Sequence, residues 1–289
     1  MADNYEEKFW TSEDGLELFY RDYAGPADAD AKPPVLCMHG LTRNSRDFAD
    51  LAEHLSATYR VIVPEMRGRG NSAYAPDSST YTPKHYVADV EKLLDELNVN
   101  RFISIGTSMG GLMTMLLAAA KPGRLAAVVM NDIGPVIDPE GVERIGAYVG
   151  QGRSYPTWIH AARSLADTHG EAFPDWDLDQ WLEMAKRNMA VCQNGRITLD
   201  YDMAIAEPFA DAPAAPAETL WLAYEALRDV PMLLVRGGLS DLLSQDTVKQ
   251  MGVRNPAMTV VTVPNVGHAP TLDEAEVRIA IDTLLAGIS

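Results

Sequence analysis

Short apolar runs alternate with amphipathic stretches over residues 35–130 of the chain. Each run is bounded by turn residues, which is typical of a buried strand, and the stretches between them repeat apolar residues at helical spacing. This pattern predicts strands at 35–38, 59–64, 102–105 and 125–130, with helices at 45–55, 83–97 and 112–120. Such alternation indicates an α/β fold with a mainly parallel sheet covered by helices on both faces.

The two ends of the chain add strands to this sheet. Near the amino terminus, apolar segments flank Asp14-Gly15, a dipeptide typical of a hairpin turn. Strand patterns return at 231–236 and 259–263, before a helical segment that starts at Leu272.

Between residues 134 and 229 the alternation stops and the pattern predicts only helices, at 139–148, 155–168, 178–191 and 216–227. Because this segment interrupts the sheet at the carboxyl ends of its strands, we predict a helical cap over 135–228 on a core domain of 1–134 and 229–289. The Pro- and Ala-rich stretch 210–217 is interpreted as a connector. Large side chains of the cap predict an apolar roof over a pocket: Trp158, Trp176, Trp181, Met184, Met189, Met203, Trp221 and Tyr224.

Composition narrows the class of partner. The 289 residues carry 24 Lys and Arg against 41 Asp and Glu, a net charge of −17 spread along the chain. Such a surface disfavours nucleic acid and anionic membranes and suits a small-molecule substrate. The first residues lack the pattern of a secretion signal, and no apolar run approaches membrane-spanning length, so a cytoplasmic protein is expected. Cys37 and Cys192 lack metal-site spacing and are expected to be reduced packing residues.

The pentapeptide 106–110, Gly-Thr-Ser-Met-Gly, joins a predicted strand to a predicted helix. Glycines two residues to either side of Ser108 permit the sharp turn that exposes a serine nucleophile. A serine hydroxyl is a weak nucleophile, so this interpretation requires a base, a group that orients the base, and hydrogen-bond donors for an oxyanion.

Of the six histidines, His39 and His268 follow predicted strands, and His268 is the candidate base. His54, His160 and His169 are expected to be solvated, and His85 has no obvious partner. Two carboxylates, Asp241 and Asp132, also follow strands and keep the order Ser, Asp, His. We prefer Asp241, because its strand directly precedes that of the histidine; Asp132, with an Asx turn or cap as its other interpretation, is the alternative acid.

An oxyanion hole needs one amide after the nucleophile and one from an earlier strand end. Met109 supplies the first. The turn His39-Gly40 after strand 35–38 presents the Leu41 amide as the second, with His39 bracing the turn.

Taken together, His39-Gly40, the segment 67–72 (Arg-Gly-Arg-Gly-Asn-Ser), the elbow 106–111, Asp241 and Gly267-His268 resemble the α/β-hydrolase superfamily over essentially the whole chain. Within it, the chain is similar to small cofactor-free serine hydrolases with a helical cap. The resemblance implies an eight-stranded sheet, no cofactor, and Ser108, His268 and Asp241 as a triad with Leu41 and Met109 as oxyanion hole. Serine at the nucleophile position disfavours dehalogenase and epoxide hydrolase chemistry.

Three functions follow as hypotheses. The first is hydrolysis of a small, largely apolar ester through an acyl-enzyme; the second keeps the triad but cleaves a lactone or a carbon–carbon bond of aromatic catabolism; the third is a non-catalytic ligand-binding protein on the same fold.

Two other sequence motifs do not hold on closer inspection. The segment 68–73 matches a dinucleotide fingerprint but precedes a loop, and 175–179 begins like a calcium loop but lacks its glycine and closing glutamate, so it is better explained as an acidic helix start.

Overall fold

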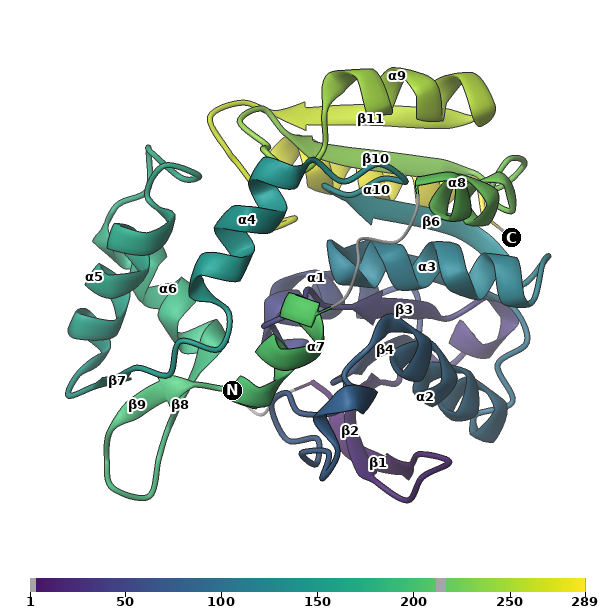
Figure 1. Ribbon diagram of the computed structural model, residues 1–289. Helices are drawn as coiled ribbons and strands as arrows, with labels where there is room; N and C mark the ends of the chain where they lie inside the picture. The colour runs from purple at the N-terminus through teal and green to yellow at the C-terminus, as the bar shows by residue number, and fades with distance from the viewer. Residues whose placement is uncertain (1–3, 212–216, 289) are drawn as a thin grey trace.

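A computed structural model describes residues 4–211 and 217–288 of the chain (Figure 1). Its main sheet consists of β1 (Glu6–Thr11), β2 (Glu17–Tyr23), β3 (Val35–Met38), β4 (Val61–Pro64), β5 (Phe102–Thr107), β6 (Leu125–Asn131), β10 (Met232–Gly237) and β11 (Met258–Val263). The strand order is β1-β2-β4-β3-β5-β6-β10-β11. β1 and β2 pair antiparallel, as does β2 with β4, and the other pairs are parallel. The predicted fold class and eight-stranded sheet are confirmed.

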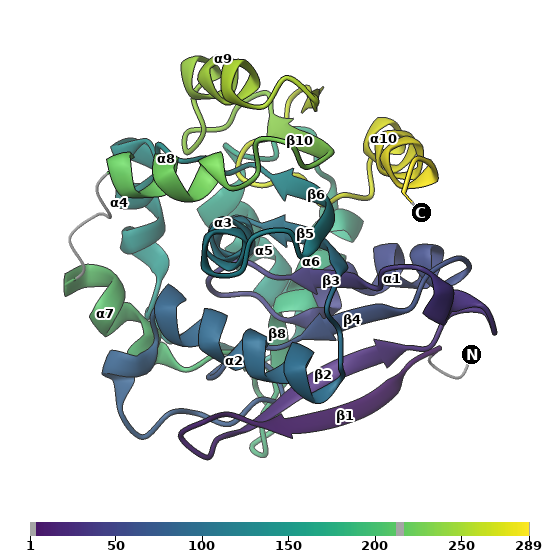
Figure 2. The ribbon, with the colours of Figure 1, turned by 90° about the vertical axis from the view of Figure 1, so that its right-hand side faces the viewer.

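Helices cover both faces of this sheet (Figure 2). One face packs against α2 (Pro83–Glu96), α3 (Met109–Ala120) and α8 (Ala217–Glu225), and the other against α1 (Ala49–Ser56) and α10 (Ala275–Ala286). Each face therefore buries its own apolar cluster, and strand residues such as Leu36 and Val35 point alternately into one cluster and the other. This two-sided burial explains why the inner strands β3, β4 and β6 are almost wholly apolar.

Between β6 and β10 the chain forms a lobe at the carboxyl ends of the parallel strands (Figure 1). It is built from α4 (Pro139–Tyr148), α5 (Trp158–His169), α6 (Leu178–Asn188) and a small antiparallel sheet of β7 (Ser154–Tyr155), β8 (Met189–Val191) and β9 (Ile197–Leu199). Asp177 caps the amino terminus of α6: its side chain accepts from the Gln180 amide while the Gln180 side chain accepts from the Asp177 amide. This capping box explains the acidic helix start.

The sequence pattern did not reveal the small sheet of the lobe, and the predicted helix 178–191 ends early because its last residues form β8. After β9, the chain continues through α7 (Ala206–Asp211). Residues 212–216 of the predicted connector lie outside the described part of the chain. The next helix, α8, packs against α3 on the same face of the sheet as α2, and not within the lobe. The limits proposed for the cap remain a prediction.

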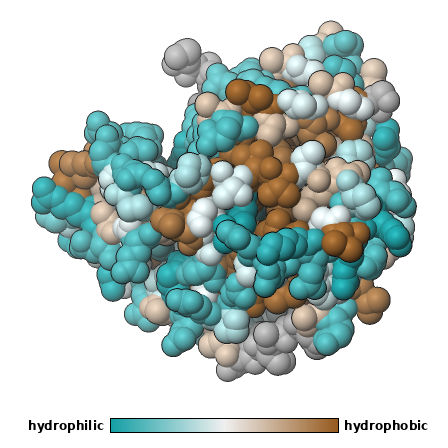
Figure 3. Space-filling model, turned by 90° about the horizontal axis from the view of Figure 1, so that it is seen from above, coloured by the Kyte–Doolittle hydropathy of each residue, from teal (hydrophilic) through white to brown (hydrophobic). Residues whose placement is uncertain are grey.

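At the edge of the sheet formed by β11, most strand residues are partly or fully exposed. β11 is an edge strand flanked by α9 (Gln245–Arg254), and the view over these two elements shows hydrophobic residues gathered in the middle of a largely hydrophilic face (Figure 3). Val253 of α9 and Val260 of β11 are exposed. Within the described ranges, no helix combines the length and apolar character needed to cross a membrane. Cys37 is buried and Cys192 exposed, and neither forms a disulfide with a described residue.

Candidate active site

Ser108 lies on a strained corner between β5 and α3. Its backbone has φ 53° and ψ −115°, a conformation that non-glycine residues rarely adopt. The corner closes tightly enough that a Cβ atom on Gly106 would overlap the backbone of Gly110, and one on Gly110 would overlap the Met38 carbonyl. The two glycines are therefore required sterically, and they hold the Ser108 side chain at the open edge of the sheet.

His268 connects this serine to a carboxylate. Its Nε2 atom lies 2.8 Å from Ser108 Oγ, and its Nδ1 atom lies 2.8 Å from Oδ2 of Asp132. Since a carboxylate oxygen accepts, Nδ1 carries the proton and the Nε2 lone pair faces the Ser108 hydroxyl. The His268 side chain is 8% exposed and that of Asp132 is fully buried. The geometry is that of a nucleophile, a base and an orienting acid.

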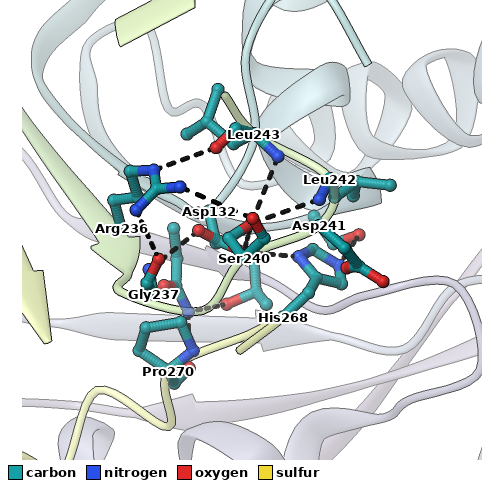
Figure 4. Close-up of polar contacts among 12 residues, drawn as sticks. Asp132, Arg236, Gly237, Ser240, Asp241, Leu242, Leu243, His268 and Pro270 are labelled. Atoms are coloured by element: carbon teal, nitrogen blue, oxygen red, sulfur yellow. Dashed lines mark hydrogen bonds and ion pairs between the residues drawn. The ribbon is translucent and has the colours of Figure 1, made fainter. Parts of the chain in front are cut away.

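Asp132 is held from several directions (Figure 4). Its Oδ1 atom accepts from the Gly237 amide at 2.9 Å, and Oδ2 accepts from the Ser240 hydroxyl at 2.7 Å as well as from the imidazole. The Ser240 oxygen in turn accepts from two amides of the following turn. With each oxygen bonded, the carboxylate cannot rotate away from His268.

Asp241, the preferred acid, makes a different contact. Its two carboxylate oxygens accept from Nε and Nη2 of Arg144 at 2.5 and 2.8 Å, and it has no hydrogen bond to His268. Burial acts to raise the pKa of Asp241, but the Arg144 guanidinium holds that pKa below its ordinary value. The structure therefore places the alternative residue, Asp132, against the imidazole. This geometry corrects the pairing of His268 with Asp241.

The order of strands in the sheet explains the difference. β6 lies between β5 and β10, so Asp132, at the end of β6, is next to the nucleophile strand, while Asp241 is one strand further away. Asp132 also has φ 55°, which turns its side chain back over the sheet edge. Neither the strand order nor this dihedral angle can be derived from the spacing of residues along the chain.

The turn after β3 lies against the nucleophile. A Cβ atom on Gly40 would be 3.7 Å from that of Ser108. Among the described residues, no acceptor is found for the amide of Leu41 or of Met109, the two donors proposed for an oxyanion. Met109 is the first residue of α3, where an amide has no partner within the helix.

His39 and Arg69 hold this turn in place. The His39 ring is fully buried; its Nε2 accepts from the Met66 amide, so Nδ1 carries the proton and donates to the Gly40 carbonyl at 2.8 Å. Burial lowers the pKa of His39 to about 4. Arg69, also buried, donates from Nε to the Leu41 carbonyl at 2.9 Å. Both side chains bind and hold the backbone of the turn after β3 and do not face the cavity.

A cavity of about 310 Å³ opens between Ser108 and the lobe. Of the large side chains predicted to form its roof, Met184 and Met189 line it, whereas the cap tryptophans pack elsewhere. The lining is more charged than predicted, because it includes four arginines: Arg43, Arg144, Arg153 and Arg187. No periodic pattern in the sequence marks them.

His169 was expected to be solvated, and this expectation is wrong. It lines the cavity beside Tyr148, with ring centroids 4.9 Å apart. Burial, aided by the charges of Arg43 and Arg144, lowers the pKa of His169 to about 4. In the part of the chain that the structure describes, no group of three or more His, Cys, Asp or Glu side chains is placed to hold a metal ion.

Comparison with known proteins identifies the class. The model of the alpha/beta hydrolase family matches residues 35–281, and the chain belongs to this family. It is 39% identical over 275 residues, 91% of each chain, to a 3-hydroxybutyrate-oligomer hydrolase of Cupriavidus necator. It is 28% identical over 238 residues, 82% of this chain and 81% of the other, to a 2-(acetamidomethylene)succinate hydrolase of Mesorhizobium japonicum. The crystal structure of an alpha/beta hydrolase from Novosphingobium aromaticivorans superposes with a TM-score of 0.94 at 53% identity, over 99% of both chains. The chain is accordingly an enzyme of the hydrolase class.

Proposed function

We propose that the chain is a serine ester hydrolase that uses Ser108, His268 and Asp132. The observation that carries this proposal is the continuous hydrogen-bonded path from the Ser108 hydroxyl through the imidazole to the buried carboxylate. In this path, Asp132 fixes the Nδ1–H tautomer, so that Nε2 is free to take the serine proton.

The reaction would proceed in two halves. Ser108 Oγ attacks the ester carbonyl carbon while Nε2 of His268 takes its proton, and the oxyanion that forms is bound by the Leu41 and Met109 amides. The imidazolium then protonates the departing alcohol, leaving an acyl-serine. Water, deprotonated by His268, attacks this acyl group, and its proton returns to Ser108 as the acid leaves.

For the substrate, we propose short oligoesters of a hydroxy acid. This class is supported by the name of the relative that is 39% identical over nine tenths of both chains. The arginines of the cavity also favour an ester with a free carboxylate over the largely apolar ester that the sequence predicted. A succinate derivative is the second candidate, because the relative named as a hydrolase of such a compound is matched over most of both chains.

The experiment is hydrolysis of 3-hydroxybutyrate dimer and trimer, beside a panel of succinate derivatives, lactones and dienoates. Ser108→Ala should abolish turnover and labelling by a fluorophosphonate, whereas Ser79→Ala, at an exposed position of the short 3-10 helix Ser78–Thr80, should retain both. Persistent labelling of Ser108→Ala would overturn the proposed nucleophile. Turnover of a lactone or dienoate in preference to the oligoesters would replace the proposed substrate class while keeping the triad.

A further inference from the structure

The cavity above Ser108 contrasts with the rest of this acidic protein. The chain has a net charge of −17, yet the described residues that line the cavity include four arginines and a single carboxylate, Asp47. Removing an arginine side chain from water is unfavourable in free energy unless the guanidinium is paired with a carboxylate or binds an anion. The partners of each arginine therefore indicate which of them is arranged to receive a ligand.

Three of the four arginines, Arg187, Arg43 and Arg153, are less suited to bind an anion in the cavity. Arg187 donates from both terminal nitrogens to two carboxylates, Asp50 and Asp273. Arg43 pairs with Asp47 within the cavity lining itself. Arg153 has no carboxylate partner among the described residues, but it is an exposed side chain on a loop. Asp47 holds Arg43 through two hydrogen bonds, to Nε and Nη2, but this carboxylate itself lines the cavity. None of these three arginines therefore combines a fixed position with a face toward the cavity that no carboxylate shares.

Arg144 combines both. Asp241 binds its Nε and Nη2 from the side, and the Nη1 nitrogen has no carboxylate partner in the described ranges. The guanidinium side chain is 28% exposed, and Asp241 itself does not line the cavity. The carboxylate therefore lies behind the guanidinium and orients it, in the manner of a preorganised anion-binding group.

The position of Arg144 is tied to the reacting atoms. Asp241 follows Ser240, whose hydroxyl donates to Asp132, the partner of His268. Asp241 is also near enough to His268 for the two side chains to interact electrostatically (Figure 4). One short loop thus fixes both the histidine and the arginine. His169 and Tyr148 experience the charges of Arg43 and Arg144 together, so the two guanidinium groups approach the same region of the cavity.

We propose that Arg144, positioned by Asp241, receives a carboxylate of the substrate and makes the enzyme selective for esters that carry a free carboxylate near the scissile bond. The inference rests on the proposed function and assigns its specificity residue. Asp241 acts through Arg144 and is a positioning residue, which explains why a carboxylate at this strand end is built into the site without contacting the histidine.

The test uses two activated esters that differ only in charge: 4-nitrophenyl hydrogen succinate and its methyl ester. The wild-type protein should have the higher kcat/KM on the anionic ester. In Arg144→Met this preference should fall at least tenfold, mainly through KM, and Asp241→Asn should reduce it in the same direction by a smaller factor. Arg144→Lys should recover only part of it, because an ammonium group lacks the planar two-point geometry.

Arg163→Met is the matched control, since Arg163 is an exposed cap arginine outside the cavity lining. It should keep the wild-type ratio of the two esters. Equal losses of Arg144→Met on both esters, or a wild-type preference for the methyl ester, would overturn the inference while leaving the serine hydrolase proposal intact. Activity of Ser108→Ala on either ester would instead overturn the proposed function.

Discussion

Oδ2 of Asp132 lies 2.8 Å from Nδ1 of His268 and accepts its hydrogen bond, whereas the neighbouring carboxylate of Asp241 is bound to Arg144. Two acidic side chains that follow adjacent strands thus have different partners, one the proposed general base and the other a cation of the cavity. This division can be tested by exchanging each for its amide.

Asp132→Asn should lower kcat on a neutral ester by about four orders of magnitude, because the amide favours the wrong imidazole tautomer. Asp241→Asn should lose far less on the same substrate, since it has no hydrogen bond to His268. Steady-state kinetics of the two variants checks this. Equal losses would show that Asp241 also supports the base.

Arg69→Lys should lower kcat with little change in KM. Arg69 donates to the carbonyls of Leu41 and Arg67 and to the Tyr86 hydroxyl, so it fixes the backbone on the carboxyl side of Leu41, the residue whose amide is the proposed oxyanion donor. Losing one oxyanion donor entirely costs about 10²–10³ in kcat, so partial misorientation should cost about tenfold or more.

Tyr86→Phe serves as the milder companion, because it removes one hydrogen bond of Arg69 and leaves its charge. It should lower kcat in the same direction by a smaller factor. A rise in KM at constant kcat in both variants would contradict the assignment, and thermal unfolding establishes that each variant is folded.

Stability should fall as the pH is lowered from about 6.5 to 4. The pKa of His39 is lowered from 6.5 to about 4 by burial, so in this window the unfolded chain binds a proton that the folded chain does not. A shift of this size corresponds to about 3 kcal/mol of unfolding free energy, present above the unfolded pKa and lost as the pH approaches the folded pKa.

Urea denaturation across this range, compared with that of His39→Gln, isolates the contribution. The variant should have a smaller slope of unfolding free energy against pH. Parallel curves for the two proteins would mean that His39 does not titrate differently in the folded and unfolded states. His169 shares the depressed pKa and should leave a residual slope in the variant.

Gly110→Ala should strongly destabilise the fold or prevent soluble expression. The added Cβ would meet the Met38 carbonyl, which is backbone of a central strand and cannot move aside. The control is Gly252→Ala in α9, where the nearest atom to a new Cβ is the flexible end of Met258 at 3.5 Å. The control should be neutral or gain about 0.5–1 kcal/mol from helix propensity. Chemical denaturation of both variants measures the difference, and a stable Gly110→Ala protein would argue against the close contact.

Much of the architecture follows from local signals. The apolar runs and their spacing predicted the strands and the fold class, and the boundaries predicted for α4 coincide with those observed. The small sheet of the lobe escaped prediction because its strands contain only two or three residues, too few to establish a period. The cap tryptophans suggested an apolar roof, but pattern alone cannot separate a side chain that fills the lobe from one that faces a cavity.

The sequence by itself determined the elbow at Ser108 and the strand-end position of His268, because glycine spacing and strand boundaries are local properties. Tertiary structure alone decided which acid faces the imidazole. Strand order placed β6 beside β5, and a positive φ turned Asp132 toward His268. Tertiary structure also decided the charge of the cavity lining, because arginines from separate segments meet there only after the lobe has folded over the sheet edge. Proximity between residues distant in sequence depends on packing, and no spacing along the chain encodes it.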